Sequence, residues 1–236
     1  MITIFTKTEE YLLNTITENA SYLKIIRKCP LFESIDGIEL EEALEFFRAE
    51  IRHHKKGDFI QTVLAPFSRF GLILSGDAMV YMDDIDGDNM IMANVSAGDT
   101  FGESLCLLGS ESPVYVQATS DVTLLSLSVS GLYGSDCDIV KCHEYLLRFS
   151  SMLARRTLAM NDRIQVLSNI TLREKIVAFL SQYRSKLSSL EFSIPFDRAS
   201  MAVYLGTDRA SLSRELSKMK QDGIIDYKKN HFIIKK

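Results

Sequence analysis

Residues 51–127 constrain the fold more than any other part of the chain, because short apolar runs alternate there with tight turns. The apolar runs have the length and composition of strands, for example Met79–Met82 and Val122–Leu127. Glycine–aspartate pairs such as Gly98-Asp99 separate them. Short strands at regular spacing, with turn signals between them, are typical of a β-roll or barrel. One acidic stretch, residues 83–89, lacks the ligand spacing of an EF-hand loop, and we predict a solvated turn.

Helices are predicted on both sides of the strand region. Apolar residues recur with helical spacing over residues 8–28 and 39–47, and again over residues 139–167. In the last of these helices a heptad seam is formed by Leu146, Leu153, Met160 and Leu167, with Ser150, Thr157 and Ile164 at the second seam position. A heptad seam predicts a helix that packs on its symmetry mate. Packing of this helix on its own barrel is the alternative.

The last part of the chain reads as a separate small domain. Thr171 and Glu174 form a capping box at the start of a helix that runs to about residue 187. A short strand is predicted over residues 191–196, followed by two helices that are separated at Gly206. Gly206 supplies the positive φ of a tight turn, and we predict Thr207 as the N-cap of the next helix. A terminal hairpin follows, with strands at 224–225 and 232–234 and a tip at 228–230.

These patterns divide the chain into three parts: residues 1–135 (N-terminal helices and β-roll), 136–168 (long helix) and 169–236 (C-terminal domain). Charge is spread unevenly over them. Residues 1–168 hold 14 basic and 24 acidic side chains, a net −10, whereas residues 169–236 hold 13 and seven, a net +6. A polyanion is the natural partner of a small basic domain. An ordinary solvated surface is the alternative.

Composition excludes several classes of protein. The chain has 236 residues, of which 46% are apolar and 25% charged, as in a globular protein of one or two domains. No apolar run approaches the ~20 residues that cross a membrane, and the N-terminus has no signal-peptide pattern. Four scattered cysteines do not make a disulfide framework. We therefore expect a cytoplasmic location and no membrane partner.

The helix after Gly206 has the character of a DNA-recognition helix. Leu212, Leu216 and Met219 form its buried stripe, and small residues keep the opposite face narrow, as entry into the major groove requires. Arginine can contact guanine with two hydrogen bonds, while hydroxyls and lysines suit phosphate oxygens. The candidate DNA-binding residues are Thr207, Arg209, Ser211, Arg214, Lys218, Lys228 and Lys229. An ordinary helical hairpin with a solvated face is the alternative.

The order of these parts resembles the Crp/Fnr family of bacterial transcription regulators. The matching residues are Lys56-Gly57-Asp58, Leu74-Ser75-Gly76, Gly98–Glu103, Gln117-Ala118-Thr119, Ala154-Arg155-Arg156 and Leu205–Leu216. The resemblance implies an α+β fold: a double-stranded β-roll of the cyclic-nucleotide-binding type, a long dimerisation helix and a winged helix-turn-helix. It also implies a homodimer that reads an inverted repeat in double-stranded DNA, RNA polymerase as a partner, and a sensor domain that sets DNA binding.

The same resemblance points to an effector pocket, formed by Gly102, Glu103, Ser104, Ser112, Pro113, Met160 and Asn161. In cyclic-AMP receptors of the family an arginine–serine pair binds the cyclic phosphate, and here Ser112-Pro113 stand in its place. Two polar residues that meet adenine are replaced by Met160 and Asn161. These departures argue against cyclic AMP. The alternatives are a less anionic effector or a degenerate sensor that needs no ligand.

Other departures argue against metal cofactors and enzyme activity. Cys29, Cys106, Cys137 and Cys142 lack the spacing of the family's iron–sulfur branch. A cupin-like metalloenzyme needs several histidines and carboxylates in the barrel, and only His53 and His54 lie in that region. We therefore predict no enzyme, no metal site and no bound cofactor. In the recognition helix, Ala210 replaces a glutamate that many family members use to read cytosine, which predicts a different DNA half-site.

Overall fold

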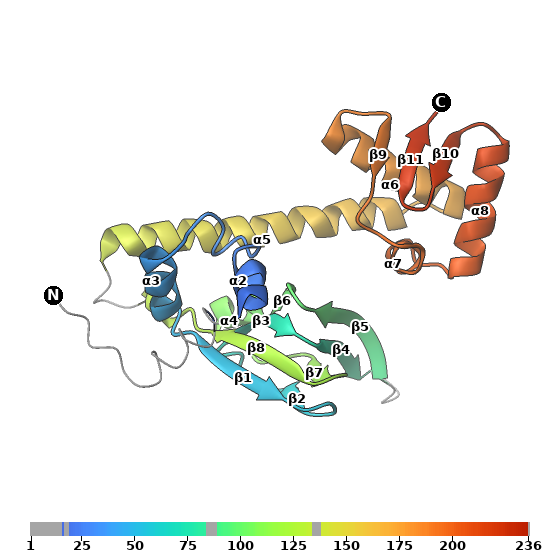
Figure 1. Cartoon of the computed structure of the whole chain (residues 1–236). Helices are drawn as coiled ribbons and strands as arrows, with labels where there is room; N and C mark the ends of the chain where they lie inside the picture. The colour runs from blue at the N-terminus through green and yellow to red at the C-terminus, as the bar shows by residue number, and fades with distance from the viewer. Residues whose placement is uncertain (1–15, 17–18, 84–88, 134–137, 236) are drawn as a thin grey trace. The chain divides into compact units, whose positions relative to one another are not determined.

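The computed structural model describes residue 16 and residues 19–83, 89–133 and 138–235 (Figure 1). Residue contacts divide the chain into two compact units, Met1–Ala154 and Arg155–Lys236. The boundary between them falls inside one continuous helix, α5 (Ile139–Leu167). Both units combine helices with antiparallel strands, so the predicted α+β class is confirmed. Among the described residues, no helix combines the length and apolar content needed to cross a membrane.

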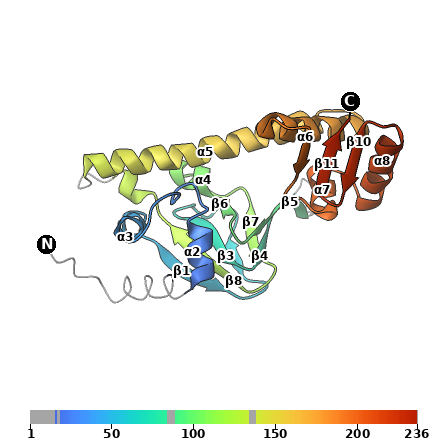
Figure 2. The same cartoon turned by 45° about the horizontal axis from the view of Figure 1, so that its top comes forward.

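The first unit is built on two four-stranded antiparallel sheets, which confirms the predicted β-roll (Figure 2). One sheet has the order β1-β8-β3-β6 and the other the order β2-β7-β4-β5. The strands are β1 (Glu50–His54), β2 (Phe59–Gln61), β3 (Phe70–Ser75), β4 (Asp77–Asp83), β5 (Asn89–Ser96), β6 (Thr100–Phe101), β7 (Tyr115–Ala118) and β8 (Val122–Leu127). Residues 84–88, in the predicted acidic turn, lie outside the described residues.

Strand β8 explains why apolar residues stand at consecutive positions in one stretch of the sequence. All six of its residues are buried. Leu124 packs in the apolar cluster between the two sheets, and Leu125 packs in a second cluster on the other face. A strand that is covered on both faces needs apolar residues at consecutive positions. Its polar residues are paired: the Thr123 hydroxyl accepts a hydrogen bond from Tyr22, and the Arg69 guanidinium donates to Ser126.

The second cluster is covered by the helices of the first unit. These are α2 (Ala20–Ile26), α3 (Ile38–Phe46), α4 (Glu103–Leu108), the short 3₁₀ helix η1 (Ser130–Tyr133) and the first part of α5. Phe32, Phe47, Phe70 and Phe149 are each at most 1% exposed and pack edge-on in this core. The sequence pattern over residues 8–28 predicts a helix without indicating what it packs against. Helix α2 lies against the roll, where Tyr22 reaches Thr123 across a distance of 3.4 Å.

The helix predicted over residues 8–28 is not continuous, and this prediction was wrong at Asn19. Asn19 has extended backbone angles, and its side chain accepts hydrogen bonds from the backbone N–H groups of Ser21 and Tyr22. It therefore acts as the N-cap of a new helix that starts at Ala20. Most of the earlier residues of the predicted helix lie outside the described residues. The second predicted helix, 39–47, is observed as α3.

The second unit contains four helical segments and a small sheet. Helix α6 (Leu172–Leu187) begins with the predicted capping box of Thr171 and Glu174. It is followed by β9 (Glu191–Ser193), α7 (Arg198–Tyr204), α8 (Arg209–Gln221), β10 (Ile225–Lys228) and β11 (His231–Ile234). The sheet has the order β10-β11-β9. Its core includes Phe179, Leu212, Leu216, Met219 and Phe232, all at most 1% exposed.

The last turns of α5 are fastened to the rest of the second unit. The Lys186 ammonium lies 2.7 Å from the Asp162 carboxylate, and the Gln182 amide donates to the Asp162 carbonyl at 2.9 Å. The Arg163 guanidinium carbon lies 5.6 Å from the centre of the Tyr204 ring. Val166 is fully buried in the core of this unit. This end of α5 is therefore part of the C-terminal fold.

Candidate DNA-binding surface and effector pocket

The turn between α7 and α8 sets the direction of the recognition helix. Gly206 has a φ of +66°, so the predicted positive φ is confirmed. The predicted N-cap, Thr207, is wrong: the cap is Asp208, whose carboxylate accepts a hydrogen bond from the Ser211 N–H at 2.8 Å. Asp208 is still extended, and its charge also suits the positive end of the helix dipole. Hydrogen bonds from Ser211 lower the pKa of Asp208.

Helix α8 presents one buried face and one exposed basic face. Leu212, Leu216 and Met219 are fully buried, which confirms the predicted stripe. Arg209, Arg214 and Lys218 are exposed on the other side. The Arg214 guanidinium donates to the Ser211 hydroxyl at 3.0 Å, so Ser211 limits the directions in which Arg214 can extend. Thr207 and Ser211 are partly exposed beside them.

The terminal hairpin adds two more cations. Lys228 and Lys229 are exposed at the turn between β10 and β11, and Lys229 has a left-handed φ of +56°. Five exposed cations of α8 and this hairpin form no ion pair within the described part of the chain, whereas a sixth, Lys220 on α8, pairs with Asp226. We call the five together the basic surface: Arg209, Arg214, Lys218, Lys228 and Lys229. Their charges are available to an external anion.

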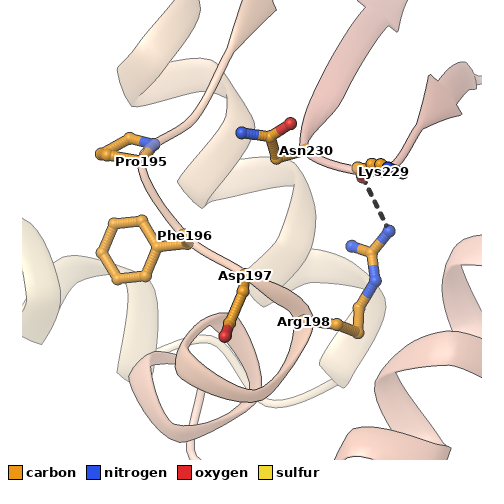
Figure 3. Close-up of a pocket in the computed structure, with 6 residues that line it drawn as sticks. All are labelled: Pro195, Phe196, Asp197, Arg198, Lys229 and Asn230. Carbon is orange, nitrogen blue, oxygen red and sulfur yellow. Dashed lines mark hydrogen bonds between the residues drawn. The ribbon is translucent and has the colours of Figure 1, made fainter.

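Two residues beside this surface, Arg198 and Asp197, were not predicted from the sequence. A pocket of about 470 Å³ is lined by Pro195, Phe196, Asp197, Arg198, Lys229 and Asn230, and Figure 3 shows these side chains. Within it the Arg198 guanidinium donates to the Lys229 carbonyl at 3.0 Å. The two residues are 31 positions apart in the sequence, and no local pattern marks such a contact. Asp197 caps α7 by accepting from the Ser200 N–H at 2.7 Å.

In the first unit, Gly102 and Glu103 lie where β6 leads into α4. Gly102 has a φ of +83°, and a Cβ atom there would overlap the Phe67 ring. Glu103 is 2% exposed and accepts a hydrogen bond from the Thr100 hydroxyl. A nearly buried carboxylate at this position is already held by its own neighbours. Ser104, the next residue of α4, is exposed.

Ser112 and Pro113 form the other side of the expected pocket. Ser112 is 1% exposed, and its hydroxyl donates to the Val114 carbonyl at 2.6 Å while accepting from the Val114 N–H at 3.2 Å. Its backbone pairs with the loop at Leu64 and Ala65. Pro113 is exposed and has no N–H to donate. This segment therefore offers a cyclic phosphate neither a guanidinium nor a free hydroxyl.

The remaining expected residues lie on α5. Met160 and Asn161 are exposed and belong to the second unit. Along the predicted seam, Leu146, Met160 and Ile164 are 46%, 58% and 61% exposed. Leu153 is partly buried against the core of the first unit. Leu167 is also partly buried, and its side chain lies within contact distance of Gly206.

Among the described residues of the first unit, His53, His54 and Cys29 have different surroundings. The His53 ring lies 3.3 Å from the Thr123 hydroxyl, whereas His54 lines a cavity of about 110 Å³ at one end of the roll. Among the described residues, buried His54 Nε2 has no hydrogen-bond partner, and burial lowers the pKa of His54. Burial raises the pKa of the Cys29 thiol to about 11. No three potential metal ligands lie together in the described ranges, and Cys137 falls outside them.

Comparison with known proteins identifies both units. Residues 51–134 match the cyclic nucleotide-binding domain family, and residues 174–236 match the Crp-like helix-turn-helix domain family. The cyclic AMP receptor protein of Thermus thermophilus is 25% identical over 197 residues, which are 83% of this chain and 88% of that protein. The two domain families together are typical of transcription regulators, so the alternative of a cupin-like enzyme is wrong.

Two solved structures share the fold. A putative cAMP-binding regulatory protein from Silicibacter pomeroyi has a TM-score of 0.53 at 19% identity, over 92% of this chain and 95% of that one. A CooA mutant from Carboxydothermus hydrogenoformans has a TM-score of 0.52 at 18% identity, over 81% and 86%. With a cyclic-nucleotide-binding-like unit, a long helix and a DNA-binding helix-turn-helix in this order, the chain belongs to the Crp/Fnr family of transcription regulators.

Proposed function

We propose that this regulator acts as a homodimer on an inverted-repeat DNA site, and that the first unit controls it through an effector other than cyclic AMP. The observation that carries the proposal is the basic surface, in which α8 and the hairpin present five exposed cations that form no ion pair among the described residues. Contact with RNA polymerase follows from the resemblance and a cytoplasmic location from the composition, and both stay predictions.

The proposed division of labour on DNA follows from the geometry of α8. Arg214 is oriented by Ser211 and is therefore the better candidate for a base contact, where direction matters. Lys228 and Lys229 at the hairpin tip suit phosphates, because an ammonium acts as a point charge. Ala210 carries no polar group, so the half-site should lack the cytosine preference that a glutamate would give.

The proposed dimer rests on α5. Met160 and Ile164 are more than half exposed although they occupy seam positions of a heptad pattern. Two such helices around a two-fold axis would bury these side chains against each other. A two-fold dimer would then place its recognition helices on half-sites in inverted orientation, about one helical turn apart.

The proposal of an effector other than cyclic AMP rests on Ser112 and Pro113. The relative from Thermus thermophilus is named a cyclic AMP receptor, but here a buried, fully hydrogen-bonded serine and a proline stand where the phosphate partners are expected. A regulator with a degenerate sensor is the second candidate. It is favoured by the apolar cluster between the two sheets, which includes Ile73, Val116 and Leu124.

The first test is a selection from random duplex DNA with the purified, ligand-free protein, alongside Arg214→Ala. Arg184→Ala, on an exposed part of α6, is the matched control because it removes the same charge from the same unit. We expect wild type and the control to enrich an inverted repeat, and Arg214→Ala to lose preference at one position of each half-site, a discrimination of about 1–3 kcal/mol. An unchanged preference in Arg214→Ala would refute its assignment.

A second selection, with and without cyclic AMP, tests the effector proposal. We expect no change in the enriched sequence or in the fraction bound. Enrichment that depends on cyclic AMP would overturn the proposal. The selection is also repeated with fractions of a cell extract added. If the ligand-free protein enriches a site and no fraction changes this enrichment, the degenerate sensor is favoured.

A further inference from the structure

We propose that Arg198 is a positioning residue that locks the hairpin turn against α7, and so fixes where Lys228 and Lys229 meet DNA. The inference rests on the proposed DNA-binding function. Arg198 is the first residue of α7, and its guanidinium donates to the carbonyl of Lys229 at the tip of the hairpin, at 3.0 Å (Figure 3). This bond joins the helix-turn-helix directly to the turn that carries both lysines.

Arg198 also contacts both strands of the hairpin. Its guanidinium carbon lies 5.1 Å from the centre of the Tyr227 ring on β10 and 5.8 Å from that of Phe232 on β11. A guanidinium at this distance from an aromatic face is attracted by the ring, more strongly when it is partly desolvated. One side chain therefore holds the two strands and the turn at once.

The burial of Arg198 argues against a direct contact between its guanidinium and a DNA phosphate. The residue is partly buried, and burial lowers its pKa. Its second guanidinium nitrogen lies 3.6 Å from the sulfur of Met201, a fully buried residue of the domain core. Within the described residues it has no carboxylate partner. Its guanidinium is therefore stabilised by two aromatic rings and a backbone carbonyl, as is expected of a side chain with a structural role.

The turn itself needs such support. Lys229 is not glycine, yet it has a φ of +56°, a region that side chains adopt only when their surroundings impose it. On the opposite side, Asn230 donates its amide to the Ile194 carbonyl at 2.9 Å, and the Ile194 N–H donates to the Asn230 carbonyl at 2.9 Å. Arg198 and the Ile194 pair thus hold the turn from two directions.

The first experiment measures the turn in the free full-length protein. Arg198→Met keeps an unbranched side chain but removes the guanidinium. Arg198→Lys keeps the positive charge but not the planar set of hydrogen-bond donors. Arg184→Met is the control. We expect hydrogen exchange of the Ile194 amide to rise about tenfold in both Arg198 variants, because a hydrogen bond to a charged group is lost, and to stay unchanged in the control. Unchanged exchange in Arg198→Met would overturn the proposal.

The second experiment measures affinity for a random-sequence duplex. If Arg198 acted on phosphate by charge, Arg198→Lys would bind like wild type; we expect it to weaken binding as much as Arg198→Met. If Arg198 acts through the two lysines, Arg198→Met lowers the affinity for DNA by less than twofold in a Lys228→Ala/Lys229→Ala background. If Arg198→Met instead lowers the affinity by the same factor in this background as in wild type, the role through the lysines is refuted. Absence of DNA binding by wild type would refute the proposed function, and the Ile194 exchange would still decide the role of Arg198.

Discussion

Asp208 shows how one side chain can decide where a recognition helix starts. Its carboxylate accepts from the Ser211 N–H, while Ser211 in turn accepts from Arg214, so the cap and the candidate base contact share one residue. A change at the cap should therefore affect both the helix and the direction of Arg214. Thr207, one position earlier, caps nothing in α8.

We expect Asp208→Ala to lower the melting temperature of the second unit by about 5 °C, through loss of a helix cap. Thr207→Ala is the matched control and should change it by less than about 1 °C, since that side chain is not the cap. Thermal unfolding followed by NMR of the α8 amides measures both. Equal effects of the two changes would restore Thr207 as a cap.

At the residue scale the sequence could not separate these two positions. Threonine and aspartate are both good N-caps, and they stand next to each other, so intrinsic preference does not choose between them. The role proposed for Arg198 was equally out of reach, because its partners Tyr227, Lys229 and Phe232 come from the hairpin about thirty residues later. Tertiary contacts of this kind leave no periodic trace in a sequence.

Elements were predicted well where one strong pattern covers them. The helix over residues 139–167 and the strand over 122–127 are observed with those bounds, because long heptad spacing favours a helix, and a short, mostly apolar segment between turn signals favours a strand. The strand predicted over 191–196 ends at Ser193, where Ile194 turns to pair with Asn230 and Pro195 cannot donate to a sheet. Boundaries failed where a side chain competed with the backbone, as at Asn19.

Helix α5 carries the prediction that belongs to the element scale. We expect Ile164→Glu to raise the dimer dissociation constant at least tenfold, because a charge would enter the apolar seam. Leu158→Glu is the control: Leu158 is 64% exposed but lies off the seam. Analytical ultracentrifugation of the full chain measures both, and equal effects would show that the seam is not the interface.

At the scale of the whole molecule, the charge division makes salt dependence informative. If the eight cations of the basic surface other than Arg214 neutralise phosphates in a dimer, the slope of log affinity against log salt is about −7. We expect Lys229→Ala to reduce its magnitude by about 2, since a dimer loses two contacts. A slope near zero would mean that the basic surface docks a protein instead of DNA.

Acid should unfold the second unit first. Hydrogen bonds and ion pairs lower the pKa of Glu174, Asp197, Asp208 and Asp226, and that of Asp226 falls to about 2 mainly through Lys220. Because the folded-state pKa values lie below the unfolded ones, this stabilisation is present above pH 4 and is lost as pH falls toward 2. Among described carboxylates of the first unit, a lowered pKa is found for Asp121.

Amide exchange from pH 5 to pH 2 measures this order. We expect residues 172–235 to lose protection at a higher pH than strands β3 and β8. Asp226→Asn should already be destabilised at pH 5 and show a shallower loss of stability toward pH 2. Simultaneous loss of protection in both units would contradict the expected order.

The boundary between the two units falls inside α5, between Ala154 and Arg155, without a loop. At this boundary, therefore, no loop separates the two units, and a substitution there falls within the helix that both units share. Each residue near that point is tied by the same backbone helix to both halves of the molecule. If the first unit responds to an effector, as proposed, an inherited change near this point is expected to alter both that response and the binding of DNA.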